Sequence, residues 1–129
     1  MAEQKIPENG LFAWNELETT DTAACKTFYA ELLGWEAEEM PMGEETYTIF
    51  KKDGKQVAGM MRILPEWGEI PSHWLGYVAV ENVDALSERV PEIGGRVIVQ
   101  PTDVPGIGRF AILSDPSGAV VSIMTFVSQ

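Results

Sequence analysis

Residues 108–124 read GRFAILSDPSGAVVSIM, two apolar runs joined by Ser-Asp-Pro-Ser-Gly. Two such runs around a turn-forming segment predict a β-hairpin with a longer loop. Pro116 presets the backbone of the turn, and Gly118 supplies the conformational freedom needed where the chain re-enters a strand. Ser122 interrupts the second apolar run four positions after Gly118. What this hairpin contributes depends on whether it has a counterpart earlier in the chain.

A counterpart does precede it, around the Asp53-Gly54 turn. The spacing of the flanking segments supports a duplication, because Gly34 follows Asp21 by thirteen residues and Gly95 follows Asn82 by thirteen. The first copy is expected to contain a strand at 10–19, a helix at 21–34 and strands at 35–39, 46–52 and 55–64. The second is expected to contain a strand at 72–82, a helix at 83–95, a strand at 96–100 and the hairpin at 108–124. The sequence thus predicts one domain, 1–129, built from two tandem βαβββ modules at 10–64 and 72–127.

Local signals place the ends of these elements. Thr20 or Asp21 is expected to cap the first helix, and Gly34 to end it. Its apolar stripe is predicted to be Ala24, Cys25, Phe28 and Leu32. Pro91 lacks the amide that would bond to the preceding turn, so the second helix is expected to kink or shorten there. Proline also marks an expected turn at 41–43 and an expected loop at 101–107.

Composition and charge limit the classes of function. The chain has 129 residues, is 45% hydrophobic and carries a formal net charge of −11. This surplus of acids repels phosphate backbones and anionic membranes, so neither nucleic acid nor a membrane is an expected partner. The single cysteine excludes an internal disulfide framework. No export leader or membrane-spanning run is recognisable, which favours a cytoplasmic location.

The repeated elements carry short motifs in a definite order. In the first copy these are Asp21, Ala24, Phe28-Tyr29 and Leu32-Leu33-Gly34-Trp35; in the second they are Val80-Glu81-Asn82-Val83-Asp84, Gly94-Gly95 and Asp115-Pro116-Ser117-Gly118. With this order and duplication, residues 10–127 resemble the vicinal oxygen chelate superfamily, also called the glyoxalase/bleomycin-resistance/dioxygenase family. The resemblance implies an α+β fold in which two βαβββ modules arrange an eight-stranded mixed sheet around a cavity. It also implies a homodimer, and functions that range from isomerases and dioxygenases to non-enzymatic drug-sequestering proteins.

The resemblance also indicates where metal-using relatives hold their ligands, on the first and last strands of each copy. Counting from the helix starts and turn glycines places those positions at Trp14, Ala58, Leu75 and Ser122. Metal-using relatives have His, Glu or Gln there, whereas this chain offers one neutral hydroxyl. Divalent cations prefer imidazole, carboxylate or thiolate ligands. The sequence therefore predicts no cofactor, with a divalent metal held only if its ligands have moved elsewhere.

Strand alternation predicts which side chains share the cavity face with these four positions. In the first copy they are Phe12, Trp14, Glu16, Ala58 and Met60, together with Tyr47 and Ile49; in the second they are His73, Leu75, Tyr77, Val120, Ser122 and Met124. Aromatic and apolar side chains with few polar groups are typical of a small-molecule site, although the same stripe fits a packed core with no ligand. Glu16 is the exception, because an acid among aromatic residues is costly to bury unless it is paired or protonated.

The leading hypothesis is a metal-free protein that binds a small, largely apolar organic molecule. Its predicted ligand-binding residues are Phe12, Trp14, Tyr47, Met60, Leu75, Ser122 and Met124. The second hypothesis is an enzyme, a lyase, isomerase or hydrolase, with Glu16 as general acid or base and His73 or Tyr77 as its partner. The third is a divalent-metal enzyme with ligands relocated to Glu16, His73 and an acid such as Glu45. Sequence alone leaves open whether the protein is an enzyme.

Overall fold

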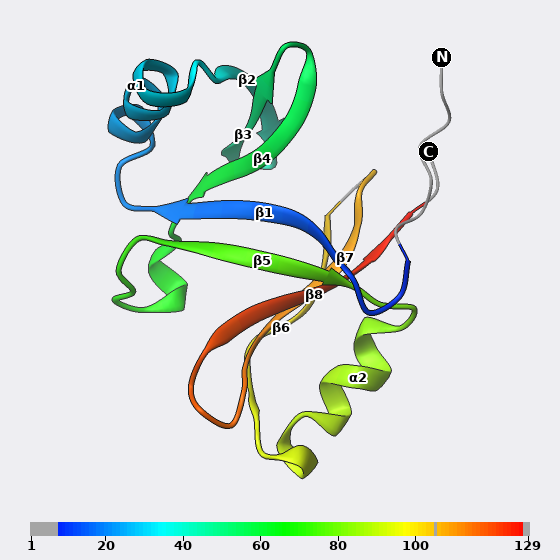
Figure 1. The fold of residues 1–129 in the computed structure, drawn as a ribbon. Helices are drawn as coiled ribbons and strands as arrows, with labels where there is room; N and C mark the ends of the chain where they lie inside the picture. Colours follow the sequence, from blue (N-terminus) through cyan, green and yellow to red (C-terminus); the bar gives the residue numbers. More distant parts are fainter. Residues whose placement is uncertain (1–7, 105, 128–129) are drawn as a thin grey trace. The chain divides into compact units, whose positions relative to one another are not determined.

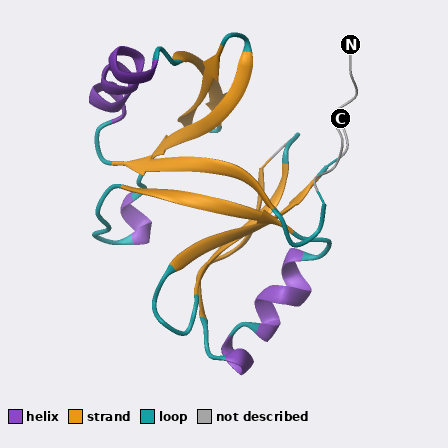
Figure 2. Cartoon of the chain, viewed as in Figure 1, coloured by secondary structure: helices purple, strands orange, loops and turns teal. Residues whose placement is uncertain are grey.

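The computed structural model describes residues 8–104 and 106–127. These residues form eight strands, two α-helices and two short 3-10 helices (Figures 1 and 2). The chain divides into two compact units: Trp14–Leu75, and a second that joins the residues before Trp14 to those from Gly76 onward. We call them the Trp14 unit and the Gly76 unit. The predicted modules, 10–64 and 72–127, remain a prediction, because the division into units falls inside two strands.

The Trp14 unit contains one helix and a four-stranded mixed sheet. Its elements are most of β1 (Phe12–Thr19), α1 (Thr22–Leu33), β2 (Glu36–Met42), β3 (Glu45–Lys52), β4 (Lys55–Arg62) and the 3-10 helix η1 (Pro65–Trp67). The strand order is β2-β3-β4-β1, with β1 parallel to β4 and the other pairs antiparallel. Asp21 accepts the Ala24 amide at 3.0 Å, and Gly34 ends α1 in the left-handed region, as the sequence predicted.

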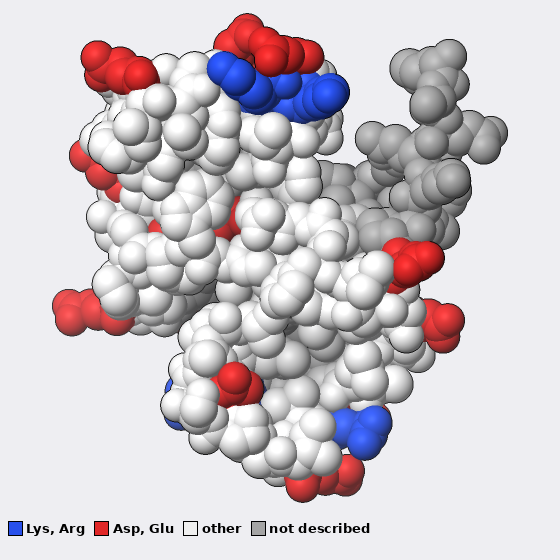
Figure 3. Space-filling view, in the orientation of Figure 1, with Lys and Arg blue, Asp and Glu red and all other residues white. Residues whose placement is uncertain are grey.

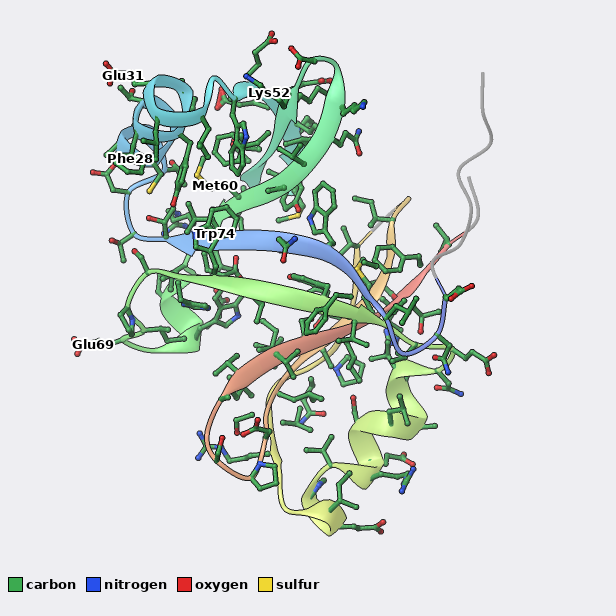
Figure 4. The ribbon with its side chains drawn as sticks, viewed as in Figure 1. Phe28, Glu31, Lys52, Met60, Glu69 and Trp74 are labelled. Atoms are coloured by element: carbon green, nitrogen blue, oxygen red, sulfur yellow. The ribbon has the colours of Figure 1, made fainter. Side chains whose placement is uncertain are left out.

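The core of this unit lies on the side of the sheet that α1 covers. Leu17, Phe50, Ala58 and Met60 are buried there, and Cys25 and Tyr29 of α1 pack against them. Figure 4 labels Met60 of this core. The predicted stripe of α1 is wrong in part, because Phe28 and Leu32 are 55% and 62% exposed. Cys25 and Tyr29 stand one helical turn apart and take the inward positions instead.

The Gly76 unit repeats this arrangement. Its elements are the end of β5 (His73–Ala79), α2 (Val83–Arg89), the 3-10 helix η2 (Pro91–Ile93), β6 (Arg96–Val104), β7 (Gly108–Ser114) and β8 (Val120–Phe126). The strand order is β5-β8-β7-β6, with β5 parallel to β8. Its core contains Val83, Val90, Ala111, Leu113 and Ile123. The α+β class and the repeated βαβββ order are confirmed. No helix among the described residues could cross a membrane.

Two predicted breaks in the strands are wrong. Pro41 lies inside β2 and Pro101 lies inside β6, whereas we expected a turn at 41–43 and a loop from 101. Both strands lie at the edge of their unit's sheet. An edge strand tolerates proline, because an amide on its outer side has no neighbouring strand to bond to. Of the expected loop 101–107, Pro105 lies outside the described residues.

Charge is distributed over the surface as isolated acids and a few ion pairs. Arg62 pairs with Glu45 at 2.8 Å, Arg109 with Asp84 at 2.8 Å, and Lys26 with Glu39 at 3.2 Å. Figure 3 shows acidic side chains scattered over the face in view, on both units. Exposed ion pairs contribute little stability. The chain as a whole carries a surplus of negative charge, and this surplus favours the approach of cations.

Candidate functional site

Four side chains of the Trp14 unit form what we call the carboxylate–aromatic cluster: Trp14, Glu16 and Glu18 from β1, and Tyr47 from β3. The three β1 residues alternate along the strand and so point to one face. The Trp14 indole Nε1 donates a hydrogen bond to the Tyr47 hydroxyl at 2.9 Å. Glu16 and Glu18 are only 3% and 1% exposed. Two buried carboxylates two residues apart therefore border a tryptophan–tyrosine pair.

Electrostatics couple the four residues. Burial, followed by the charge of Glu16, raises the pKa of Tyr47, and a hydrogen bond with the Glu16 carboxylate acts in the same direction. Burial is also the largest cause raising the pKa of Glu18, to about 9, and the charge of Glu16 adds to it. At neutral pH the Tyr47 phenol is therefore protonated, and Glu18 carries its proton as a neutral acid.

Gly59 of β4 makes room for this cluster. It pairs with Glu16 on one side and with Ile49 on the other. A Cβ placed on Gly59 would overlap the Tyr47 hydroxyl and would lie 2.9 Å from the Trp14 Nε1. The absence of a side chain here is what lets Tyr47 cross the strand and reach Trp14. Sequence reasoning missed Gly59, although a glycine inside a strand is a recognised sign of close approach.

The predicted orientation of β4 is wrong by one residue. Leu17 pairs with Met60 and Phe50 pairs with Ala58, and all four lie in the core under α1. Met60, predicted to bind ligand, therefore lies on the opposite side from Trp14 and Glu16, and Ala58 lies with it. Gly59 and Met61 stand beside the acids instead. Because strand alternation has period two, a shift of one residue exchanges the two faces.

In the second hairpin, Ser122 and Met124 are buried, whereas Val120, predicted to lie on the same face, is 45% exposed. Tyr77 pairs with Ser122 and Ala79 with Met124, so by alternation these side chains share one face with Leu75. All five are buried. The Ser122 hydroxyl donates to the Ala111 carbonyl at 2.8 Å within the Gly76 unit. Their contact with a ligand remains a prediction.

Two further predicted residues lie in more open surroundings. Phe12 is 72% exposed, and its ring lies against Gly76. His73 is half-buried at the start of β5. Its Nδ1–H donates to the Pro71 carbonyl at 2.8 Å, which holds the ring against its own chain. Their roles in binding and catalysis remain predictions.

The residues at the family's metal positions do not fit a metal ion. Trp14, Leu75 and Gly59, which replaces Ala58 on the corrected face, offer no suitable donor atom, and the Ser122 hydroxyl donates to a carbonyl. Across residues 8–104 and 106–127 there is no group of three or more His, Cys, Asp or Glu side chains that could hold a metal. Glu45, proposed as a relocated ligand, bonds to Arg62 through both carboxylate oxygens.

An open groove of about 520 Å³ also lies in the Trp14 unit. It runs along the end of β4 and the connector that follows; Figure 4 labels Glu69 on this connector. Its lining residues are Thr20, Arg62, Ile63, Leu64, Pro65, Gly68, Glu69, Ile70 and Pro71. None of these belongs to the carboxylate–aromatic cluster. Burying an acid costs free energy, and acids that are nevertheless buried are concentrated at functional sites. We therefore place the candidate site at the carboxylate–aromatic cluster.

Replacing Ser122 with alanine tests whether its hydroxyl is structural. Since it supports the Ala111 carbonyl in a fully buried place, Ser122→Ala is expected to lower the free energy of unfolding by about 1–2 kcal/mol. Ligand affinity is expected to stay within twofold of the unaltered protein. Urea unfolding and calorimetric titration measure the two quantities. Unchanged stability with lost binding would instead make Ser122 a ligand contact.

The chain belongs to the glyoxalase/bleomycin resistance protein/dioxygenase superfamily, whose family model matches residues 12–123. Among curated relatives, it is 36% identical over 120 residues to the putative glyoxylase CFP32 of Mycobacterium tuberculosis, covering 92% of this chain and 45% of that protein. It is 38% identical over 127 residues to the anthracycline biosynthesis protein DnrV of Streptomyces peucetius, covering 88% of this chain and 46% of that protein. The chain thus spans about half the length of these relatives.

Solved structures show the same fold. Methylmalonyl-CoA epimerase of Streptomyces coelicolor, in complex with 2-nitronate-propionyl-CoA, matches with a TM-score of 0.65 at 16% identity, over 94% of this chain and all of that one. The Mn(II)-bound glyoxalase of Novosphingobium aromaticivorans matches with a TM-score of 0.56 at 23% identity, over 91% of this chain and 39% of that one. At these identities the likeness establishes the fold alone.

Proposed function

We propose that this chain binds a small, largely apolar organic molecule at the carboxylate–aromatic cluster, without a resident metal. The observation that carries the proposal is the burial of Glu16 and Glu18 beside the hydrogen-bonded Trp14–Tyr47 pair. Burying two carboxyl groups costs free energy, and buried acids with shifted pKa values are concentrated at functional sites. The donor-poor metal positions support the metal-free part of the proposal. Solved structures of the same fold hold small molecules, among them 2-nitronate-propionyl-CoA and methylmalonyl-CoA, which supports a small-molecule ligand in general.

A proton-transfer enzyme is the second candidate. The observation favouring it is that the Tyr47 phenol shares a hydrogen bond with Glu16, while burial keeps the neighbouring Glu18 protonated. Two neighbouring buried carboxyl groups, of which Glu18 holds its proton, can take up and return a proton between them. In such a lyase, isomerase or hydrolase, Glu16 would act as the base. His73 and Tyr77 remain the proposed partners.

The setting of this function is proposed from the sequence. We expect a homodimer in the cytoplasm, whose partner is a small molecule rather than nucleic acid or a membrane surface. The net charge of −11 supports the last point, because anionic polymers and lipids are repelled. Light scattering of the purified protein measures the oligomeric state.

A matched pair of tryptophan variants tests the binding site. Trp14→Phe removes the indole donor that Tyr47 accepts, and is expected to weaken binding of any hit from a thermal-shift screen by tenfold or more. Trp74→Phe is the control, because the indole of Trp74, labelled in Figure 4, donates to the Tyr29 hydroxyl of α1 at 3.1 Å in a second tryptophan–tyrosine pair. Calorimetric titration measures both affinities. Equal losses in the two variants would argue against a site at the cluster.

Replacing the proposed base separates binding from catalysis. Glu16→Gln keeps the shape of the side chain and removes its charge. If the protein only binds its ligand, the expected loss is in affinity alone. If Glu16 is a base, solvent deuterium exchange into a bound carbon acid should fall by at least a hundredfold. No exchange with the unaltered protein would exclude the enzyme alternative for that ligand.

A further inference from the structure

The second carboxyl of the cluster is in an unusual position. Glu18 is 1% exposed, and its Oε2 has no hydrogen-bond partner among the described residues. A buried polar atom without a partner destabilises the folded chain, so each instance calls for an explanation. The described residues supply no hydrogen-bond donor to this atom. The position therefore suits a donor that arrives with a ligand.

The groups facing Glu18 define its electrostatic surroundings. On its own strand, β1, Glu16 adds negative charge, and from β3 comes the Tyr47 phenol. β4 contributes Gly59 and Met61, which do not titrate. β5, the other neighbour of β1, begins with His73, whose Nδ1–H donates to the Pro71 carbonyl at 2.8 Å. Arg62, the next residue of β4, pairs with Glu45 at the surface. No basic side chain of the described residues contributes to the pKa of Glu18, which burial and Glu16 both raise.

Building on the proposed function, we propose that the ligand is an organic cation: a protonated amine carried on an aromatic or apolar frame. Its ammonium group would donate hydrogen bonds to the Oε2 of Glu18 and to the carboxylate of Glu16. The Tyr47 phenol interacts with both carboxyl groups and accepts a hydrogen bond from Trp14, so two aromatic side chains belong to the same cluster. Aromatic rings favour both apolar frames and positive charge. The negative net charge of the chain assists the approach of a cation.

Binding of this ligand is linked to a proton. In the free protein at neutral pH, Glu18 is a neutral acid. When the ammonium binds, the O–H bond of Glu18 breaks and the proton leaves to solvent, so that the carboxylate pairs with the cation. The ammonium keeps its own proton, so the balance is one ligand bound and up to one proton released. By linkage, affinity should rise with pH, by up to about tenfold per pH unit, until Glu18 is ionised.

Calorimetry with two simple probes tests the inference. 2-Phenylethylammonium is the cation, and 2-phenylethanol is an uncharged molecule of similar size. Titrations from pH 6 to 8.5, in two buffers of different ionisation enthalpy, give affinity and proton release together. The expected result is tighter binding of the ammonium than of the alcohol, by at least tenfold at pH 8. Proton release should approach one near pH 7, and the alcohol should show no pH dependence.

Variants locate the effect. Glu18→Gln should abolish the proton release and weaken ammonium binding at pH 8 by at least tenfold. Glu88→Gln, the same change at an exposed position on α2, should alter neither quantity. If the Glu18 variant binds the ammonium as the unaltered protein does, the cation is held elsewhere and the inference is wrong.

The remaining outcomes separate this inference from the proposed function. If the alcohol binds as tightly as the ammonium and Trp14→Phe weakens it, the cluster is a ligand site but not a cation site. If affinity for the ammonium falls as pH rises, the neutral form of Glu18 is the binding form and the inference is again overturned. If neither probe nor any compound of a thermal-shift screen binds in a way that depends on Trp14, both proposals fail.

Discussion

Replacing Glu18 with glutamine is expected to raise the free energy of unfolding at pH 7 by about 3 kcal/mol. In the folded chain, burial and then the charge of Glu16 raise the pKa of Glu18 from 4.5 to about 9. Below about pH 4.5 both the folded and unfolded chains hold this proton, so its contribution to stability is fully present. As pH rises toward 9 the unfolded chain loses the proton first, and stability falls. Glutamine resembles the neutral acid and avoids this loss.

The pH dependence distinguishes this cause from a general gain in packing. The difference between the variant and the unaltered protein should be small at pH 5 and should grow steadily through pH 8. Urea unfolding followed by tryptophan fluorescence at four pH values measures it. Glu88→Gln is the control, since Glu88 is exposed. A stability difference of the same size at pH 5 and pH 8 would contradict the assignment of a raised pKa to Glu18.

Adding one methyl group at Gly59 is expected to disrupt the site. Glycine-to-alanine changes inside strands ordinarily stabilise, because alanine loses less conformational freedom on folding. Here the new Cβ would overlap the Tyr47 hydroxyl, and Tyr47 is held by Trp14. Gly59→Ala should therefore destabilise the chain by about 2–3 kcal/mol and displace the phenol. The indole N–H resonance of Trp14 should shift as its hydrogen bond is lost, and affinity for the probes should fall by at least tenfold.

A second close contact provides the control. A Cβ on Gly76 would lie 2.7 Å from the ring of Phe12, but that ring is 72% exposed and can move aside. Gly76→Ala should therefore cost less than about 1 kcal/mol. In a Tyr47→Ala background, Gly59→Ala should also become nearly neutral, because the clashing atoms are gone. If its cost persisted in that background, Tyr47 would not be the cause.

The fold could be predicted because its signals are local and repeated. Asp21 and Gly34 bound α1 through their own backbone and capping preferences, and Asn82 begins α2 in the same way, accepting the Ala85 amide at 3.0 Å. Pro91 ends α2 by removing an amide. Such preferences act within a few residues and need no tertiary information. The repeat of these signals then identifies the duplication and the family.

The orientation of β4 could not be predicted, because it depends on the turn that precedes it. The first hairpin closes with Lys52 opposite Lys55, whereas the second closes with Ser114 opposite Val120. Gly54 therefore lies one residue before its strand and Gly118 two residues before its strand. Counting the same number of residues from each glycine leads to opposite faces of the two sheets. A register shift after Phe50 adds to the difference. The count from Gly54 put Ala58, and by alternation Met60, on the side of Trp14, whereas both lie in the core under α1.

The sequence alone determined the repeated βαβββ order, the family, the positions of both helices and the side chains at the family's metal positions, because capping, turn and strand signals depend on neighbouring residues. It also singled out Glu16 and Trp14. Only the tertiary structure showed that Glu18 and Gly59 belong to the same cluster and that Met60 lies in the core. It also showed that the Ser122 hydroxyl donates to the Ala111 carbonyl. These outcomes depend on strand pairing and burial, which bring together residues far apart in the chain.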